Sequence, residues 1–292
     1  MSVKLKYRGR FVTDADVALI QQLIKAHPTL SRRALSKKLC EVWNWFQANG
    51  QPRDMVCRGL MLALHRAGHI ELPKQRCIPD NPLTRRRRPR TIEADRVALR
   101  GPLSSVGPIH FQQVRRTAEE AVLNSLIEQY HYLGYTHPVG EHLKYMVWAQ
   151  GRPIACLAWS SAPHHLGPRD RFIGWSAEAR RRNIQAVAYN LRFLILPWVE
   201  VPHLASHILG RMAKVVPRDW QRIYGHPVYF LETFVDPQRF RGTCYLAANW
   251  IVLGCTTGRG KNDQTHRPNR PIKQVLGYPL CQHFRRLLSH VS

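Results

Sequence analysis

Apolar residues in the first quarter of the chain recur with the three- and four-residue spacing of amphipathic helices. This spacing predicts three helices, which begin at capping residues near Asp14, Ser31 and Asp54. Their apolar stripes consist of Val17, Ile20 and Ile24, of Leu35, Leu39 and Val42, and of Leu60, Leu64 and Ala67. A short extended stretch, 69–73, follows the third helix. We therefore predict a winged helix-turn-helix-like domain over residues 13–75.

Basic residues lie on or beside the second and third of these helices. A winged helix-turn-helix inserts one helix into the major groove, so we expect these side chains to contact DNA. The residues are Arg32, Arg33, Lys37 and Lys38 on the second helix and Arg53 and Arg58 at the third. The alternative is a plain three-helix bundle with a solvated charged face, and Gly59 inside the third helix disfavours that helix.

The next stretch, 76–103, is too rich in proline for a helix and too charged for a core. It contains four consecutive arginines, which are Arg85, Arg86, Arg87 and Arg88. We predict a basic linker between two domains. Its arginines either stay solvated or lie along the phosphates of DNA, and in the second case they would make the affinity sensitive to salt.

The pattern of residues 104–292 predicts a mixed α/β domain. A helix that begins near Thr117 precedes two β-type runs, 142–148 and 153–159, whose separation is that of a hairpin. The elements expected after the hairpin are an apolar run over 186–199, a helix over 204–215, a strand over 229–236, a helix over 243–250, a strand over 251–253 and a terminal helix over 282–289.

The charge of the chain narrows its partners. Among 292 residues, 44 are Lys or Arg and 19 are Asp or Glu, which gives a formal net charge of +25. We therefore expect DNA as the partner, either duplex or with a single-stranded or flipped base. Seven cysteines form no C-x-x-C pair, which indicates a reducing cytoplasm and no zinc site. No apolar run approaches a membrane span, and the first residues lack a signal peptide's apolar core.

The strand over 229–236 ends at Asp236 and leads through an arginine-rich turn into a helix start. Backbone N–H groups at a helix N-terminus are unsatisfied and attract anions, so this turn is a candidate phosphate cradle. A second basic loop, hinged by glycines, is also suited to phosphate or DNA. The candidate residues are Arg239, Arg241 and Gly242 in the turn and Arg259 and Lys261 in the second loop.

Glu232 is the candidate general base. Alternation along the strand puts it on one face with Phe230 and Phe234, where desolvation would raise the pKa of its carboxyl group. The alternative is an ion pair with a structural arginine such as Arg192. Tyr245, in the helix that follows, is a candidate general acid or nucleophile, or else a buried tyrosine bonded to the backbone.

His131 and Asp236 are candidate catalytic partners of Glu232. The three side chains would supply nitrogen and oxygen ligands to a divalent ion that cleaves phosphodiesters, whereas the ordinary role of Asp236 is to cap the turn. Tyr130 and Tyr132 flank His131. They either stack on an unpaired base or pack in the core.

Two resemblances are carried by these segments. The order of strand, helix, hairpin and strand, followed by the residues Arg239-Phe240-Arg241-Gly242-Thr243-Cys244, is similar to the GNAT acyltransferases. The cofactor loop of that fold reads arginine or glutamine, two residues, glycine, one residue, then glycine or alanine. The resemblance implies an acyl-coenzyme A site, from whose pattern Cys244 departs because it is larger than the usual residue.

Residues from about 125 to 280 resemble the DruA family of the Druantia anti-phage systems, which also occurs beside transposase genes. The segments that carry this resemblance are Tyr130–Gly134, Phe172–Trp175, Asn190–Val199, Leu231–Asp236, Gly242–Trp250 and Gly258–Gly260. The resemblance implies a role with DNA in phage defence or in a mobile element, with a helicase or transposase encoded nearby.

Three functions stay open at this point. The leading hypothesis is a DNA-binding protein whose GNAT-like domain modifies a base or strand near Glu232. The second is a transposase-type or defence nuclease that uses Glu232, Asp236 and His131 with Mg²⁺. The third is a non-catalytic DNA-binding adaptor that recruits a helicase or a transposase.

Overall fold

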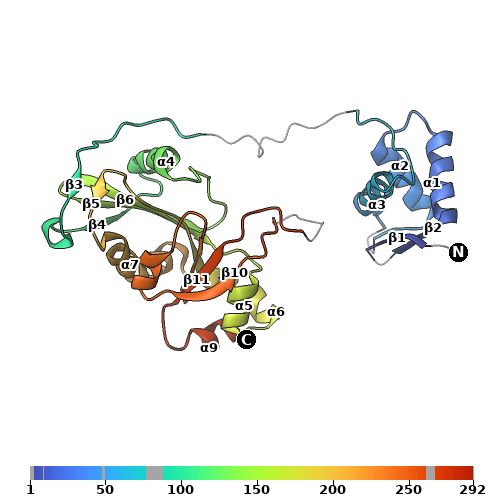
Figure 1. Ribbon diagram of the computed structural model, residues 1–292. Helices are drawn as coiled ribbons and strands as arrows, with labels where there is room; N and C mark the ends of the chain where they lie inside the picture. The colour runs from blue at the N-terminus through green and yellow to red at the C-terminus, as the bar shows by residue number, and fades with distance from the viewer. Residues whose placement is uncertain (1–2, 9, 48–49, 77–87, 261–266, 292) are drawn as a thin grey trace. The chain divides into compact units, whose positions relative to one another are not determined.

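The computed structural model divides the chain into two compact units, residues 1–85 and 86–292. It describes all residues except 1–2, 9, 48–49, 77–87, 261–266 and 292 (Figure 1). Four residues expected to contact DNA lie outside the described residues, and their contacts stay predictions. They are Arg85, Arg86, Arg87 and Lys261.

The first unit contains the three helices that the spacing predicts. They are α1 (Asp14–Ala26), α2 (Arg32–Val42) and α3 (Asp54–Arg66), and a hairpin of β1 (Val3–Tyr7) and β2 (Arg10–Thr13) precedes them. Thr13 and Asp16 form a capping box at the start of α1. The helices pack around a core that includes Ile20, Leu35 and Leu64.

Two details of this unit depart from expectation. Residues 69–73 follow α3 without pairing as a strand, so the expected wing is not formed there and the winged-helix assignment stays a prediction. Gly59 inside α3 has a packing reason, because a Cβ atom there would lie 2.2 Å from the hydroxyl of Tyr7. The ring of the hairpin residue occupies the space that a side chain would need.

The second unit is built on a seven-stranded mixed sheet of order β10-β11-β9-β7-β6-β5-β4. Neighbouring strands are antiparallel except for β7 and β9, which are parallel. The strands are β4 (His110–Gln113), β5 (His142–Ala149), β6 (Arg152–Ser161), β7 (Val187–Ile195), β9 (Phe230–Val235), β10 (Ile251–Cys255) and β11 (Gln274–Pro279).

Helices cover both faces of this sheet, and Figure 1 shows α4 on one side and α7 on the other. Consecutive residues of β5 confirm the arrangement, because Lys144 bonds to Glu120 of α4 whereas Tyr145 bonds to Asp219 of α7. The helices are α4 (Glu119–Tyr130), α5 (Gly167–Ile173), α6 (Ala177–Asn183), α7 (Leu204–Tyr224), α8 (Thr243–Ala247) and α9 (Phe284–Ser289). The predicted mixed α/β fold is therefore confirmed.

The second unit begins before residue 104, where the sequence pattern set its start. The backbone N–H of Ile92 donates to Ser125 Oγ at 2.8 Å, and Gln129 Nε2 donates to the Ile92 carbonyl at 3.1 Å. The short strand β3 (Leu99–Arg100) then pairs with β8 (Val199–Glu200). No helix in the described part of the chain is both long and apolar enough to cross a bilayer.

Candidate functional site

The two parallel strands at the centre of the sheet separate before they end. Pairing between β7 and β9 runs from Val187 and Phe230 to Asn190 and Thr233 and then stops, although β7 continues to Ile195. The register between β6 and β7 shifts at the same level. This irregularity lets β7 follow β6 while it leaves β9, so an opening forms in the middle of the sheet.

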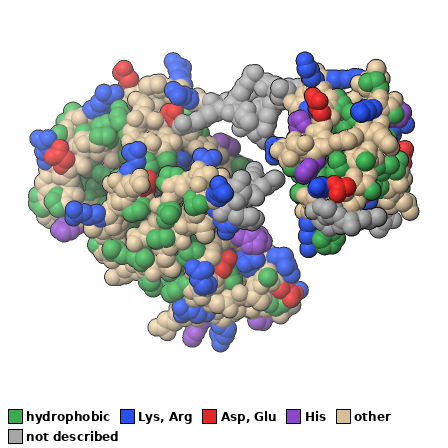
Figure 2. All heavy atoms as spheres, turned by 45° about the vertical axis from the view of Figure 1, so that its right-hand side comes forward, with side chains coloured by type: hydrophobic (Ala, Val, Ile, Leu, Met, Phe, Trp, Pro, Cys, Tyr) green, Lys and Arg blue, Asp and Glu red, His purple; other side chains and the backbone are tan. Residues whose placement is uncertain are grey.

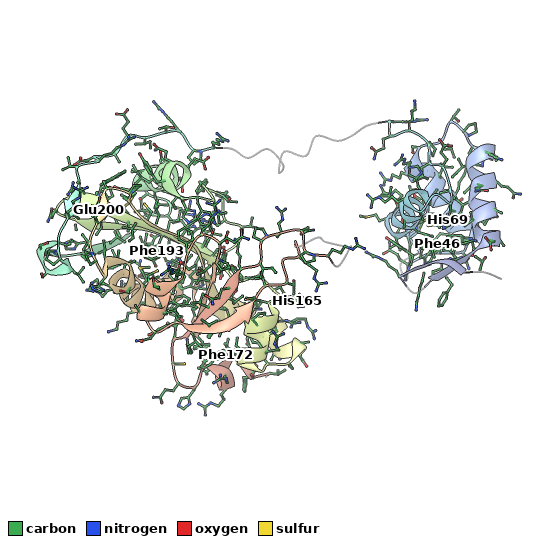
Figure 3. All side chains as sticks on the ribbon, viewed as in Figure 1. Phe46, His69, His165, Phe172, Phe193 and Glu200 are labelled. Carbon is green, nitrogen blue, oxygen red and sulfur yellow. The ribbon has the colours of Figure 1, made fainter. Side chains whose placement is uncertain are left out.

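A pocket of about 430 Å³ lies at this opening. Phe193, labelled in Figure 3, lies on the β7 side of it. Seven residues that the sequence marks as candidates line it, although they come from three separate segments: Tyr130, His131, Tyr132, Asp236, Arg241, Gly242 and Tyr245. The fold thus brings three of the four catalytic candidates together with two aromatic and two phosphate-binding candidates in one cavity.

Positive charge predominates in the pocket lining. Arg192, Arg241 and Lys273 line the pocket, whereas Asp236 is the only acidic residue among the described residues that line it. The buried guanidinium of Arg192 is held in place because Nε donates to the Gly134 carbonyl at 2.9 Å and Nη1 to the Leu191 carbonyl at 2.8 Å. Burial lowers the pKa of Lys273, and the nearby Arg192 lowers it further, while Asp236 opposes both. The pocket is therefore suited to an anion.

Aromatic rings stand at the mouth of the pocket. Tyr132 and Phe240 are 38% and 50% exposed, and their ring centroids lie 5.2 Å apart in an edge-on contact. The guanidinium of Arg239 lies 5.3 Å from the Tyr132 ring centroid. Exposed large aromatic side chains beside cations are a surface on which a base can stack. Arg239 thus lies beside the mouth of the pocket and does not line it.

His131 is held in one protonation state. Burial lowers the pKa of its imidazole to about 4, and the charges of Arg192 and Lys273 lower it in the same direction. Its Nδ1 lies 3.2 Å from the backbone N–H of Leu133, so Nδ1 accepts and the ring proton is assigned to Nε2. At neutral pH the ring is an uncharged hydrogen-bond donor.

The turn after β9 presents backbone N–H groups to this pocket. Within the described residues, the N–H groups of 241–244 donate to no backbone carbonyl. Gly242 has φ of +69°, a conformation that favours glycine. Cys244 also lines the pocket, and burial raises the pKa of its thiol. The turn thus has backbone N–H groups without a backbone acceptor, and the Cys244 side chain lies beside them where the GNAT loop pattern has the smaller glycine or alanine.

Tyr245 and Asp236 both have structural partners. The Tyr245 hydroxyl donates to Asn190 Oδ1 at 2.6 Å, and burial raises its pKa. The carboxylate of Asp236 accepts the N–H of Gln238 at 3.1 Å, and its carbonyl accepts two further N–H groups, so it caps the turn. Ionising Tyr245 would break its bond to an acceptor, so we assign it to positioning Asn190 and not to nucleophilic attack.

Glu232 lies outside the pocket lining. Its side chain is fully buried, and both carboxylate oxygens accept from Arg169 Nη1, at 3.4 and 3.3 Å. Arg169 is fully buried as well and also donates to Asp170. The arginine partner is thus Arg169 on α5, whereas Arg192 bonds elsewhere. Burial raises the pKa of Glu232 to about 7 even though Arg169 lowers it.

The proposed metal ligands do not gather at one point. Within the described residues there is no group of three or more His, Cys, Asp and Glu side chains arranged to hold a metal ion. His131 and Asp236 border the pocket while Glu232 faces Arg169. The three side chains proposed as ligands therefore do not form one site. Arg259 does not belong to the pocket lining either.

Sequence reasoning missed Lys273, Phe240 and Arg169 as parts of these two sites. Arg192 was considered only as a partner of Glu232, although an arginine inside the most apolar segment of the chain is itself a signal of a buried functional charge. Lys273 belongs to the continuation of the glycine-hinged basic loop, and only the pairing of β11 with β9 brings it to this pocket.

Solved structures that resemble part of this chain include acetyltransferases. An N-acetyltransferase from Staphylococcus aureus Mu50 has a TM-score of 0.36 and 10% identity, and covers 60% of this chain and 99% of its own. The ribosomal-protein-S18-alanine N-acetyltransferase from Escherichia coli has a TM-score of 0.37 and 11% identity, with 60% and 96% covered. The aminoglycoside acetyltransferase AAC(6')-Ib has a TM-score of 0.38 and 12% identity, with 61% and 98% covered.

No curated protein matches the chain. The structure has the order of strand, helix, hairpin and strand on which the GNAT resemblance rests, as β4, α4, the hairpin of β5 and β6, and β9. The family described as Druantia protein DruA matches residues 84–288, which is most of the chain and nearly all of the second unit. The chain therefore belongs to the DruA family.

Proposed function

We propose that this protein binds DNA and that the pocket between β7 and β9 receives one phosphate-bearing nucleotide of it, unpaired or extruded from the duplex. The observation that carries the proposal is the combination of exposed aromatic rings, three cations and a single carboxylate in one pocket. Rings stack on bases regardless of sequence, and cations with unsatisfied N–H groups hold phosphate.

Each part of the pocket has a separate role in this proposal. Arg241 and the N–H groups of 241–244 hold the phosphate, while Tyr132 and Phe240 stack on the base. The Nε2–H of His131 is available to an acceptor on the base or sugar. Cationic side chains spread over the surface would draw DNA toward the protein (Figure 2).

The proposed setting is phage defence or a mobile element, as the DruA resemblance implies. We further propose that the bound base or strand is modified, and that the reaction takes place in the pocket and not at Glu232. The Glu232 carboxylate is fully buried and paired with Arg169, so it cannot accept a proton from a ligand in that pocket.

An acyl-coenzyme A donor is a second candidate for the same pocket. The N–H groups of 241–244, which donate to no backbone carbonyl in the described residues, and the opening between β7 and β9 favour a ligand with a pyrophosphate and a narrow extended arm. The donor would supply an activated acyl group, and the chain would hold its phosphates at Arg241. The Cys244 side chain leaves less room for a pyrophosphate in this turn, but the backbone N–H groups and Arg241 can still donate to it.

Fluorescence anisotropy of labelled oligonucleotides tests the proposal. We expect Tyr132→Ala to weaken binding of single-stranded DNA by about 1–3 kcal/mol, the value of one stacked base. Arg241→Gln should weaken it too, whereas the control Arg286→Gln, on α9 and exposed, should not. Wild-type affinity in both pocket variants would contradict the proposal.

Displacement of DNA by coenzyme A at low concentration would favour the second candidate, and an unchanged oligonucleotide mass with intact binding would favour the adaptor.

A further inference from the structure

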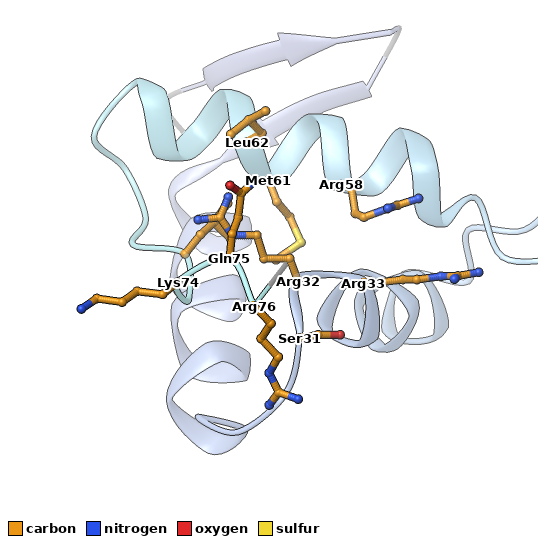
Figure 4. Close-up of a pocket in the computed structure, with 10 residues that line it drawn as sticks. Ser31, Arg32, Arg33, Arg58, Met61, Leu62, Lys74, Gln75 and Arg76 are labelled. Carbon is orange, nitrogen blue, oxygen red and sulfur yellow. The ribbon is translucent and has the colours of Figure 1, made fainter. Parts of the chain in front are cut away.

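A second cationic cavity lies in the first unit, where α2 begins. It has a volume of about 400 Å³ and is enclosed by the N-terminus of α2, one side of α3 and the segment that follows the helices (Figure 4). The lining residues include five cations, which are Arg32, Arg33, Arg58, Lys74 and Arg76. None of the described residues that line it is acidic.

The cations are held close together by the fold. Arg32 Nε donates to the Pro73 carbonyl at 2.7 Å, and Arg76 donates to the Thr29 carbonyl, so the segment after α3 is fastened across the start of α2. A guanidinium has five N–H donors, and one such bond leaves most of them for a ligand. Figure 4 shows Arg33 and Arg58 extending in the same direction from α2 and α3.

One carboxylate lies near the cavity and cannot neutralise it. Asp54 contacts Arg33 at 3.6 Å and Arg58 at 3.4 Å, but these two side chains remain 69% and 40% exposed. Ion pairs of this exposure are weak, and a multiply charged anion would compete with a single carboxylate. The floor of the cavity is apolar, because Met61 and Leu72 line it while they are nearly buried.

We infer that this cavity is a separate anchoring site for the phosphodiester backbone of a nucleic acid strand. Several cations around an apolar floor match consecutive phosphates joined by sugars, because the phosphates meet the arginines and the sugar covers Met61 and Leu72. The site differs from a recognition helix in the major groove, since the segment after α3 supplies Lys74 and Arg76. The inference depends on DNA as the partner, and on nothing about the pocket in the second unit.

The test compares charge-matched variants of the full chain by anisotropy over a range of salt. Arg58→Gln with Lys74→Gln removes two charges from the cavity, and Lys6→Gln with Lys25→Gln removes two from outside it in the same unit. We expect the cavity pair to weaken duplex binding about tenfold and to reduce the slope of log affinity against log salt by about 2. The control pair should change both quantities much less.

Equal effects of the two double variants would overturn the inference, because they would indicate only general attraction by charge. Failure here is distinguishable from failure of the proposed function. Loss of binding in Tyr132→Ala with no effect of the cavity pair refutes the cavity alone, and the reverse pattern refutes the pocket alone. Polyglutamate is the probe for an acidic protein partner. If it displaces DNA from the cavity at equal charge concentration, the site binds an acidic protein and the inference of a DNA site is refuted. Arg58→Lys, which keeps the charge, should bind nearly as the wild type does.

Discussion

The free energy of unfolding should depend on pH because Glu232 titrates, and the variant Glu232→Gln should lack this dependence. The carboxylate is fully buried, and the pKa in the folded protein is raised to about 7 by burial, against 4.5 as the ordinary value. Between these two values the folded chain holds a proton that the unfolded chain releases, so the free energy of unfolding falls as pH rises. The loss between pH 5 and pH 8 is between about 2 and 3 kcal/mol.

Glu232→Gln replaces the ionisable group with a neutral one of the same shape. Arg169 keeps its bonds to Asp170 and to the carbonyls of Pro163 and His164, so the variant should fold. As pH rises from 5 to 8, we expect the free energy of unfolding of the variant minus that of the wild type to increase by about 2–3 kcal/mol. Urea unfolding of both proteins at several pH values measures this, and contributions that the two proteins share cancel in the difference.

The comparison of the two proteins also removes the opposing effect of His131. The pKa of His131 in the folded protein is lowered to about 4. The contribution of its neutral imidazole to stability is therefore lost as pH falls from about 6.5 through about 4. A difference between wild type and Glu232→Gln that does not change from pH 5 to pH 8 would refute the reasoning. It would show that Arg169 outweighs burial and keeps the carboxylate ionised throughout.

Three further changes test the packing. Arg169→Met should destabilise the protein by about 3–5 kcal/mol in urea unfolding at neutral pH, because it leaves the carboxylates of Glu232 and Asp170 without their shared cation; a loss under 1 kcal/mol would contradict the ion pair. Gly277→Ala should cost about 1–3 kcal/mol by thermal unfolding, since its Cβ would lie 2.3 Å from the ring of Phe230. Gly210→Ala, inside α7 with nothing within 4 Å, should instead stabilise by about 0.5–1 kcal/mol, and equal effects of the two alanines would disprove the packing assignment.

The elements that sequence predicts well are those whose signal is local. The capping residues and apolar spacing of α1, α2 and α3 lie within each helix, and the hairpin of β5 and β6 shows its own turn. The strand β11 and the short helix α5 were not predicted. The position of β11 is set by pairing with β9, which a local pattern does not contain.

The candidate site was predictable in composition but not in geometry. Tyr132 and Arg241 were marked for separate reasons, and only the fold shows that they line one pocket. The position of Glu232 outside the pocket has a physical cause. The alternation correctly buries the residue, but the cation that meets it comes from Arg169, 63 residues away, and this pairing separates the carboxylate from the pocket.

Photocrosslinking tests the central claim most directly, because it identifies the residues that touch a base. An oligonucleotide with one photoreactive halogenated uracil at an unpaired position would be irradiated with the wild-type protein, and the crosslinked peptides would be sequenced by mass spectrometry. We predict adducts on Tyr132 or Phe240, at the mouth of the pocket between β7 and β9. Efficient crosslinks that fall entirely outside the pocket, and that persist in Tyr132→Ala, would contradict it.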